Sequence, residues 1–201
     1  MNANKNLSLF FRGEPPGQRT NALRWLQKKV MEQALRLPRE FPTREAWEAF
    51  RDHMRRELPK VIGLPQFPPM GASTIRARIL VGEDVLLERV DVDVDGDYAI
   101  PTFVFMPLSR PQGRMPGLVW NPGWPQDKWE RAYQEFAVRM ARQGFVVLIL
   151  DHAPFGETAP RQLQTTHAMD ALMGMGHLLG ISQLALRAAE TMRAGEYLRS
   201  R

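Results

Sequence analysis

The segment 121–128 has the residue types of a loop that stabilises negative charge. It follows a short apolar run and precedes a helical pattern, so we expect it to join a strand to a helix. Gly123 allows a sharp bend, which leaves the N–H groups of Trp124, Gln126 and Asp127 free at the start of that helix. A rigidly held N–H group in this position stabilises a developing oxyanion. An ordinary strand-to-helix turn with a packed tryptophan explains the same residues.

A second candidate loop, residues 151–158, follows another apolar run. It contains two titratable side chains, Asp151 and His152. Adjacent residues that leave a strand point to opposite sides, so these two need not act together. His152, His167 and His177 are widely separated and lack the close helical pair of ligands typical of a zinc site. The sequence therefore predicts no metal site.

Ser182 lies in a segment that partly matches a nucleophile elbow. The elbow has the pattern Gly-x-Ser-x-Gly, and residues 180–184 read Gly-Ile-Ser-Gln-Leu, which fails at the last position. No convincing strand precedes this segment, and a long helical pattern follows it. We therefore interpret Ser182 as the N-cap of a helix over about residues 182–198.

The two loops require a framework of strands and helices. Residues 145–150 are apolar without alternation, which is typical of a parallel strand buried on both faces. Residues 117–120 form a shorter apolar run, and a helical pattern over residues 127–142 lies between the two runs. A strand, a helix and a strand within about 35 residues have the size of a right-handed crossover unit.

Signals at the ends of the predicted elements are also present. Asp127 and Glu130 have the spacing of a capping box, and Gly144 is placed to stop the helix.

Residues 169–176, rich in Met and Gly, are predicted to be irregular. A pocket wall, a lid and core packing all remain open for this segment.

An antiparallel hairpin is expected earlier, within residues 73–106. Valines alternate with aspartates over residues 90–95, which marks one buried face and one wet face. Asp95-Gly96 is a tight-turn dipeptide, after which the chain returns as a second strand. The aspartates also resemble the start of a calcium loop, but Thr102 stands where that loop needs a bidentate Glu. The hairpin is the favoured interpretation.

Residues 1–60 are predicted to form a basic helical extension. Two amphipathic helices are expected between residues 21 and 58, with Pro42-Thr43 as a cap and Pro59 as the stop of the second helix. The extension holds 13 Lys/Arg and 7 Asp/Glu, against 14 and 15 in the rest of the chain. Aromatic side chains do not interleave with the basic ones as in a base-stacking groove. We therefore do not predict nucleic-acid binding.

The composition bounds the class of protein. A length of 201 residues, with 44% hydrophobic and 24% charged residues, is typical of a globular chain. The absence of Cys excludes a disulfide scaffold, a thiolate zinc site and a cysteine nucleophile. Apolar runs are too short to span a bilayer, and the start lacks a signal-peptide core. We expect a cytoplasmic protein with no cofactor and no membrane partner.

Taken in order, these segments resemble the α/β-hydrolase fold, and more closely its acetylxylan-esterase-like and dienelactone-hydrolase-like branches. The resemblance spans about residues 58–201. Residues 61–65 (Val-Ile-Gly-Leu-Pro) and 100–107 resemble the family's N-terminal extension and entry hairpin. Residues 116–128 (with Asn-Pro-Gly-Trp-Pro) resemble the strand and loop of the oxyanion hole, and residues 144–157 (ending Asp-His-Ala-Pro-Phe-Gly-Glu) resemble the next strand. Residues 180–201 resemble the helix before the nucleophile strand.

The resemblance implies a fold class and a set of site residues. The fold is the N-terminal half of an α/β-hydrolase sheet: an antiparallel entry hairpin and then β-α-β-α, preceded by the α-helical extension. Residues 61–201 are then an incomplete hydrolase domain. Trp124 is implied as the backbone N–H donor of the oxyanion hole, and Gly123 as the residue that permits its bend. His152 and Phe155 are expected to bind substrate.

Two departures from the family pattern matter. Asn121-Pro122-Gly123 stands where the family usually has a His. The Gly-x-Ser-x-Gly elbow, the acid and the His follow the crossing helix in this family, and Arg201 is at the end of that helix. We therefore expect an N-terminal segment of a serine ester hydrolase that lacks its Ser-His-Asp triad and is inactive as residues 1–201.

The substrate of the full-length protein is then a small-molecule ester. The alternative is a non-catalytic interaction protein, which pairs its open sheet edge with another chain or with a second copy of itself. A third hypothesis is a basic adaptor whose N-terminal helices bind nucleic acid or an anionic surface.

Overall fold

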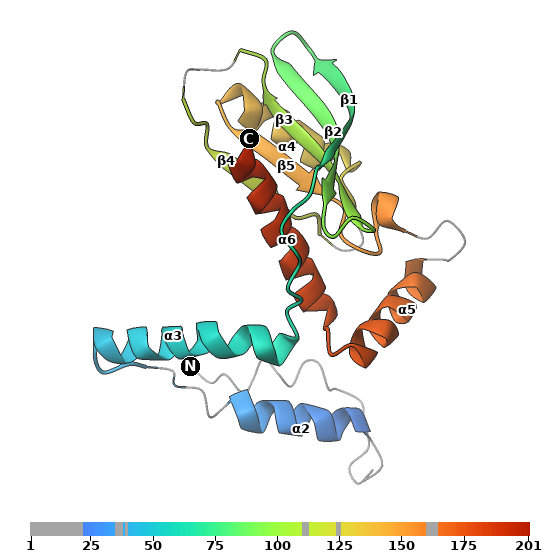
Figure 1. Cartoon of the computed structure of the whole chain (residues 1–201). Coiled ribbons are helices and arrows are strands. Elements are labelled where there is room, and N and C mark those ends of the chain that lie inside the picture. The colour runs from blue at the N-terminus through green and yellow to red at the C-terminus, as the bar shows by residue number, and fades with distance from the viewer. Residues whose placement is uncertain (1–21, 35–37, 39, 110–112, 124–125, 160–164) are drawn as a thin grey trace. The chain divides into compact units, whose positions relative to one another are not determined.

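The computed structural model of the chain describes residues 22–34, 38, 40–109, 113–123, 126–159 and 165–201 (Figure 1). The chain divides into two compact units, Met1–Asp52 and His53–Arg201. The described residues contain no helix with the length and apolar character needed to cross a membrane.

The two predicted N-terminal helices are present. α2 spans Ala22–Ala34, and α3 spans Arg44–Ile62, beginning in the first unit and ending in the second. Thr43 caps α3, because its Oγ1 accepts a hydrogen bond from the N–H of Ala46 at 3.1 Å. The cap that the sequence predicted is therefore confirmed.

The prediction that Pro59 stops α3 is wrong, because the helix continues to Ile62. A proline in the last turn removes only one backbone donor, so the helix can run on to a better stop. That stop is Gly63, which has a φ of 69°. Its N–H donates to the carbonyl of Lys60 at 3.2 Å, and the N–H of Leu64 donates to that of Pro59 at 2.8 Å. These two bonds form a Schellman end.

The second unit contains a mixed five-stranded sheet with the strand order β1-β2-β3-β5-β4 (Figure 1). β1, β2 and β3 are successive antiparallel neighbours, β3 pairs antiparallel with β5, and β5 pairs parallel with β4. The hairpin and the parallel pair predicted from the sequence are both confirmed. The strands are β1 Thr74–Val81, β2 Val85–Asp93, β3 Ala99–Pro107, β4 Gly117–Trp120 and β5 Val146–Leu150.

Helices cover the two faces of this sheet. Val147 and Ile149 of β5 pack with α4, Arg131–Arg142, whereas Leu148 of the same strand packs on the side of α6, Gln183–Ser200. Alternate residues of β5 point to opposite faces, so a strand buried on both sides reads as a continuous apolar run. The second unit is therefore a three-layer α/β/α structure.

The aspartates of the β2–β3 turn serve the hairpin. Asp93 Oδ1 accepts the N–H of Gly96 at 3.1 Å, and Asp95 Oδ1 accepts two further backbone N–H groups of the turn. Asp91 pairs with Arg76, at 2.6 Å from its Nη2. In the part of the chain that the structure describes, no three or more His, Asp or Glu side chains are grouped to hold a metal ion.

The Met- and Gly-rich segment is a helix, which corrects the prediction that it is irregular. α5 spans Thr165–Leu178. Gly176 is needed there because a Cβ at this position would lie 2.6 Å from the carbonyl oxygen of Ile181. The glycine therefore serves a close backbone approach and does not break the helix.

Candidate functional site

The two candidate loops lie at the same edge of the sheet. β4 and β5 are parallel neighbours, so Asn121 after β4 and Asp151 and His152 after β5 leave the sheet side by side. In α/β sheets this carboxyl edge is where ligands bind.

The backbone around Gly123 is held by hydrogen bonds. Its N–H donates to Tyr133 Oη at 3.1 Å, and its carbonyl accepts the N–H of Gln126 at 2.7 Å. The expectation of a free N–H at Gln126 is therefore wrong. A Cβ on Gly123 would lie 3.3 Å from Tyr133 Oη, so a glycine fits this close approach. Trp124, the predicted oxyanion donor, lies outside the described residues.

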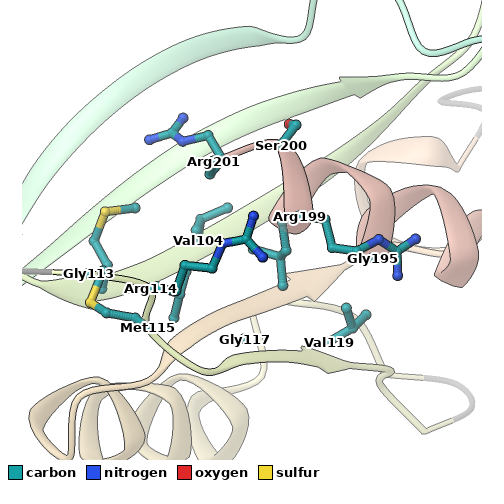
Figure 2. Close-up of a pocket in the computed structure, with 13 residues that line it drawn as sticks. Val104, Gly113, Arg114, Met115, Gly117, Val119, Gly195, Arg199, Ser200 and Arg201 are labelled. Carbon is teal, nitrogen blue, oxygen red and sulfur yellow. The ribbon is translucent and has the colours of Figure 1, made fainter.

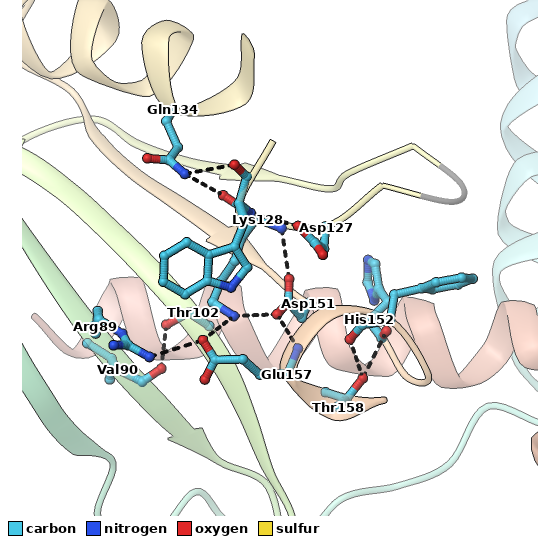
Figure 3. Close-up of polar contacts among 12 residues, drawn as sticks. Arg89, Val90, Thr102, Asp127, Lys128, Gln134, Asp151, His152, Glu157 and Thr158 are labelled. Carbon is cyan, nitrogen blue, oxygen red and sulfur yellow. Dashed lines mark hydrogen bonds and ion pairs between the residues drawn. The ribbon is translucent and has the colours of Figure 1, made fainter. Parts of the chain in front are cut away.

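Lys128 and Asp151 form the most buried polar pair of the site (Figure 3). The Lys128 ammonium contacts Asp151 Oδ2, and the Lys128 backbone N–H donates to Asp151 Oδ1 at 2.8 Å. The N–H of Glu157 also donates to Asp151 Oδ2, at 2.9 Å. Asp151 thus ties the loop after β4 to the loop after β5 through three donors.

This tie moves the start of α4. The capping box predicted at Asp127 and Glu130 does not form, because α4 begins at Arg131 and Glu130 makes no side-chain cap. Asp127 Oδ1 instead accepts the N–H of Trp129 at 2.8 Å, closing a short turn. Because the backbone N–H and the ammonium of Lys128 both bond to Asp151, residues 127–130 stay outside the helix.

Glu157 completes the cluster at its outer side. Its Oε1 lies 2.9 Å from Lys128 Nζ and 3.2 Å from Arg89 Nη2. Burial raises the pKa of Glu157, but the hydrogen bonds and positive charges of Lys128 and Arg89 together lower it by more. The pKa of Glu157 is therefore below its usual value. The Glu157 carboxylate therefore remains charged and structural at neutral pH.

Gly156 makes this loop geometry accessible. It has a φ of 57°, and a Cβ there would lie 2.2 Å from Asp151 Oδ2. Only glycine lets the backbone wrap this closely around the buried carboxylate.

His152 faces a different partner from Asp151, as the alternation of strand residues predicted. Its Nδ1 lies 2.6 Å from Glu190 Oε2, and its Nε2 lies 3.2 Å from Asn121 Oδ1. Glu190 is fully buried and also accepts hydrogen bonds from Tyr98 Oη and the N–H of Ala153. The histidine therefore links α6 to the end of β4.

Tyr98 acts in this network as a hydrogen-bond donor. Burial, together with the negative charge of Glu190 and the hydrogen bond to it, raises the pKa of Tyr98 well above its usual value. Its hydroxyl therefore keeps its proton, and the Glu190 carboxylate is bound by donors on both oxygens.

Three of the four predicted site residues line one small hollow of about 10 Å³. They are Gly123, His152 and Phe155. The other lining residues are Pro122, Gln126 and Arg187.

Ser182 is an N-cap, as interpreted from the sequence. Its Oγ accepts the N–H of Ala185 at 3.1 Å at the start of α6. Among the described residues, no hydroxyl group hydrogen-bonds to the ring of a histidine. The site therefore has backbone donors and charged side chains but no activated nucleophile in the described part.

Three further residues of the site were not predicted from the sequence: Lys128, Glu190 and Arg187. α6 buries Ala185, Ala189 and Ala194, and Glu190 lies between them on the same buried face. A charged residue within a stripe of small residues signals a buried polar partner, and this signal was present in the sequence.

No protein-family model matches the sequence, and the search of curated proteins gives no match. Solved structures do match. One is a protein from Bacteroides fragilis NCTC 9343 provisionally described as an acetyl xylan esterase, with a TM-score of 0.67 and 16% identity over 87% of this chain and 50% of that one. Another is the methylesterase BT1017, with a TM-score of 0.53 and 18% identity over 69% of this chain and 33% of that one.

These similarities establish the fold. The chain has a partial α/β-hydrolase-type fold, like that of the two esterases. It spans about half the length of the first of these structures and a third of the second.

Proposed function

We propose that this chain is the N-terminal half of a serine ester hydrolase of the acetylxylan-esterase or dienelactone-hydrolase kind. The observation that carries the proposal is the shared fold, which matches an esterase-like structure over 87% of this chain. The loops after β4 and β5, which lie at the ligand-binding edge of such a sheet, support it further.

The role proposed for the loop after β4 is to stabilise the oxyanion. The backbone N–H of Trp124 would bind the negative oxygen that forms when a serine attacks the ester carbonyl. Gly123 and its hydrogen bond to Tyr133 support this role by fixing the start of the loop. His152 and Phe155 are proposed to contact the substrate beside it.

The attacking serine and its base are proposed to lie in sequence beyond residues 1–201. These residues contain no Gly-x-Ser-x-Gly motif. An ester hydrolase without its nucleophile and base loses nearly all of its rate, because these groups act as a unit. Residues 1–201 alone are therefore proposed to be inactive.

A cavity lies beside the end of α6 on one face of the sheet (Figure 2). Its volume is about 800 Å³, and residues of β3, β4 and β5, the end of α6 and the segment before β4 line it. β4 pairs with β5 on one side only, so its other edge has unpaired backbone groups in the described structure. The residues that line the cavity include Val104, Arg114, Gly117, Val119, Leu198 and Arg201.

The experiment is to sequence the coding DNA beyond the codon for Arg201. The proposal expects an open frame that encodes a short strand and a Gly-x-Ser-x-Gly motif within about 20 residues, the length of a strand and its loops. A stop codon directly after Arg201, or a long frame without the motif, would contradict it.

The alternative function is a non-catalytic interaction protein. The observation that favours it is the same open edge of β4, which could pair with a strand of another chain or of a second copy. In that case the free edge of β4 is the interface, and no segment with a nucleophile is needed.

A further inference from the structure

The side-chain amide of Asn121, the first residue after β4, meets two polar groups with one of its atoms. That atom, placed as Oδ1, lies 3.2 Å from Nε2 of His152 and 3.2 Å from Oγ1 of Thr191 on α6. Asn121 is exposed, and its other amide atom has no hydrogen-bond partner among the described residues. The oxygen and the nitrogen of an amide have nearly the same shape, so their partners decide which of them faces inward.

Thr191 requires a donor from Asn121. Its hydroxyl donates to the carbonyl of Arg187, one turn earlier in α6, at 2.8 Å, which is the shorter of its two contacts. A hydroxyl has only one proton, so Oγ1 cannot donate to Asn121 while it makes this bond. Its lone pairs can still accept a hydrogen bond, and the amide nitrogen of Asn121 can supply the proton.

His152 requires the same nitrogen when its ring is neutral. Nδ1 lies 2.6 Å from Oε2 of Glu190, which is fully buried. A carboxylate only accepts hydrogen bonds, so the ring proton is on Nδ1. Nε2 then carries a lone pair, which repels a carbonyl oxygen and accepts an N–H. Because both ring nitrogens are used within the protein, a ligand can meet only carbon atoms of this ring.

We propose that Glu190, His152 and Thr191 are positioning residues that hold Asn121 with its amide nitrogen inward and its carbonyl oxygen outward. The nitrogen donates one N–H to Nε2 of His152 and the other to Oγ1 of Thr191, so each donor meets one acceptor. The oxygen remains for solvent or a ligand at the carboxyl edge of β4 and β5.

This orientation selects the ligand group that can lie beside Asn121. A carbonyl oxygen accepts hydrogen bonds, so a hydroxyl or an N–H of a ligand fits, whereas a carboxylate or an oxyanion is repelled. For catalysis this role rests on the proposed ester hydrolase, in which backbone N–H groups of the loop, and not the Asn121 side chain, would bind the oxyanion. The orientation itself does not depend on that function.

NMR spectroscopy of residues 1–201 at about pH 7.5 tests the orientation. The ring nitrogen signals of His152 should show a protonated Nδ1 and an unprotonated Nε2. Both amide protons of Asn121 should exchange with water about tenfold more slowly than those of Gln143, because each makes a hydrogen bond. Gln143 is an exposed side-chain amide and serves as the reference.

One substitution tests the contact with His152. Asn121→Asp places an oxygen beside Nε2, so the ring of His152 should gain a second proton. Gln143→Glu is the matched control, since it makes the same change of charge at an exposed position and should leave the ring unchanged.

A second pair of variants tests the contact with Thr191. Thr191→Val removes the acceptor of one N–H of Asn121, so that proton should exchange about fivefold faster. Thr191→Ser keeps the hydroxyl and should restore the slow exchange.

The proposal is overturned if both ring nitrogens of His152 are protonated in the unaltered chain, because the oxygen of Asn121 then faces the ring. Amide protons of Asn121 that exchange as fast as those of Gln143 would overturn it as well, as would an unprotonated Nε2 in Asn121→Asp. A chain with the expected signals whose longer reading frame proves to lack a nucleophile would keep the orientation and lose the proposed function.

Discussion

The side chains of Lys128 and Asp151 form an ion pair in the interior of the second unit, with 1% and 0% of their side-chain surfaces exposed. Asp151 follows β5, and Lys128 precedes α4, so the pair joins two loops that are 23 residues apart in the chain. The pair therefore positions both loops of the candidate site.

Replacement of Lys128 by Met should destabilise the protein strongly. The change leaves the Asp151 carboxylate buried with only backbone donors, and removal of one partner from a buried pair costs about 3–5 kcal/mol. The free energy of unfolding from urea denaturation measures this loss. Arg131→Gln is the control, since Arg131 pairs with Glu135 at the surface and should leave stability unchanged. Equal stabilities of the two variants would contradict the structural role of the pair.

Glu157 should make stability depend on pH in the acidic range. Its pKa is lowered in the folded protein, so its contribution is present above the unfolded value of 4.5 and is lost as the pH falls through the lower folded value. The stability difference between the unaltered chain and Glu157→Gln should therefore shrink between neutral pH and about pH 3. Urea denaturation across this range measures it, and a difference that grows toward low pH would refute the assignment.

Ser182 should matter for helix stability and not for chemistry. Ser182→Ala removes the bond to the N–H of Ala185 and should cost about 1 kcal/mol. Ser182→Asn, which keeps a capping oxygen, should restore most of this loss. If thermal unfolding shows no difference between the Ala and Asn variants, the cap does not contribute as described.

The framework of the second unit followed closely from sequence patterns. The valines of β2, the apolar run of β5 and the glycine after α4 each depend on neighbours in sequence, and such signals are local. α5 was missed because its Met and Gly residues were read as irregular, although its helix brings Gly176 close to Ile181. That contact is part of the end of α5, where the N–H of Ile181 donates to the carbonyl of Gly176 at 2.8 Å and Gly180 has a φ of 70°.

The site was predictable only in part. Gly123, His152 and Phe155 were identified because they follow strands, and the structure brings them to one hollow. The partners of these loops, Lys128 and Arg187, depend on contacts between distant segments. The capping box predicted at Asp127 and Glu130 does not form, because the bonds between Lys128 and Asp151 keep these residues outside α4.

Self-association should reveal whether the β4 edge is accessible. Unpaired strand edges promote pairing between chains, so sedimentation velocity of residues 1–201 should show species larger than a monomer that increase with concentration. A monodisperse monomer at all concentrations would count against the interaction protein proposed as the alternative.

The hydrolysis of p-nitrophenyl acetate tests whether ester hydrolysis requires sequence beyond residues 1–201. Residues 1–201 and the product of the longer reading frame are assayed side by side, with Ser182→Ala as the background. We expect no turnover by residues 1–201. We expect turnover by the longer product, which should disappear when the serine of its Gly-x-Ser-x-Gly motif is changed to alanine. Turnover by residues 1–201 that Ser182→Ala removes, or a longer product that contains the motif and is inactive, would contradict this expectation.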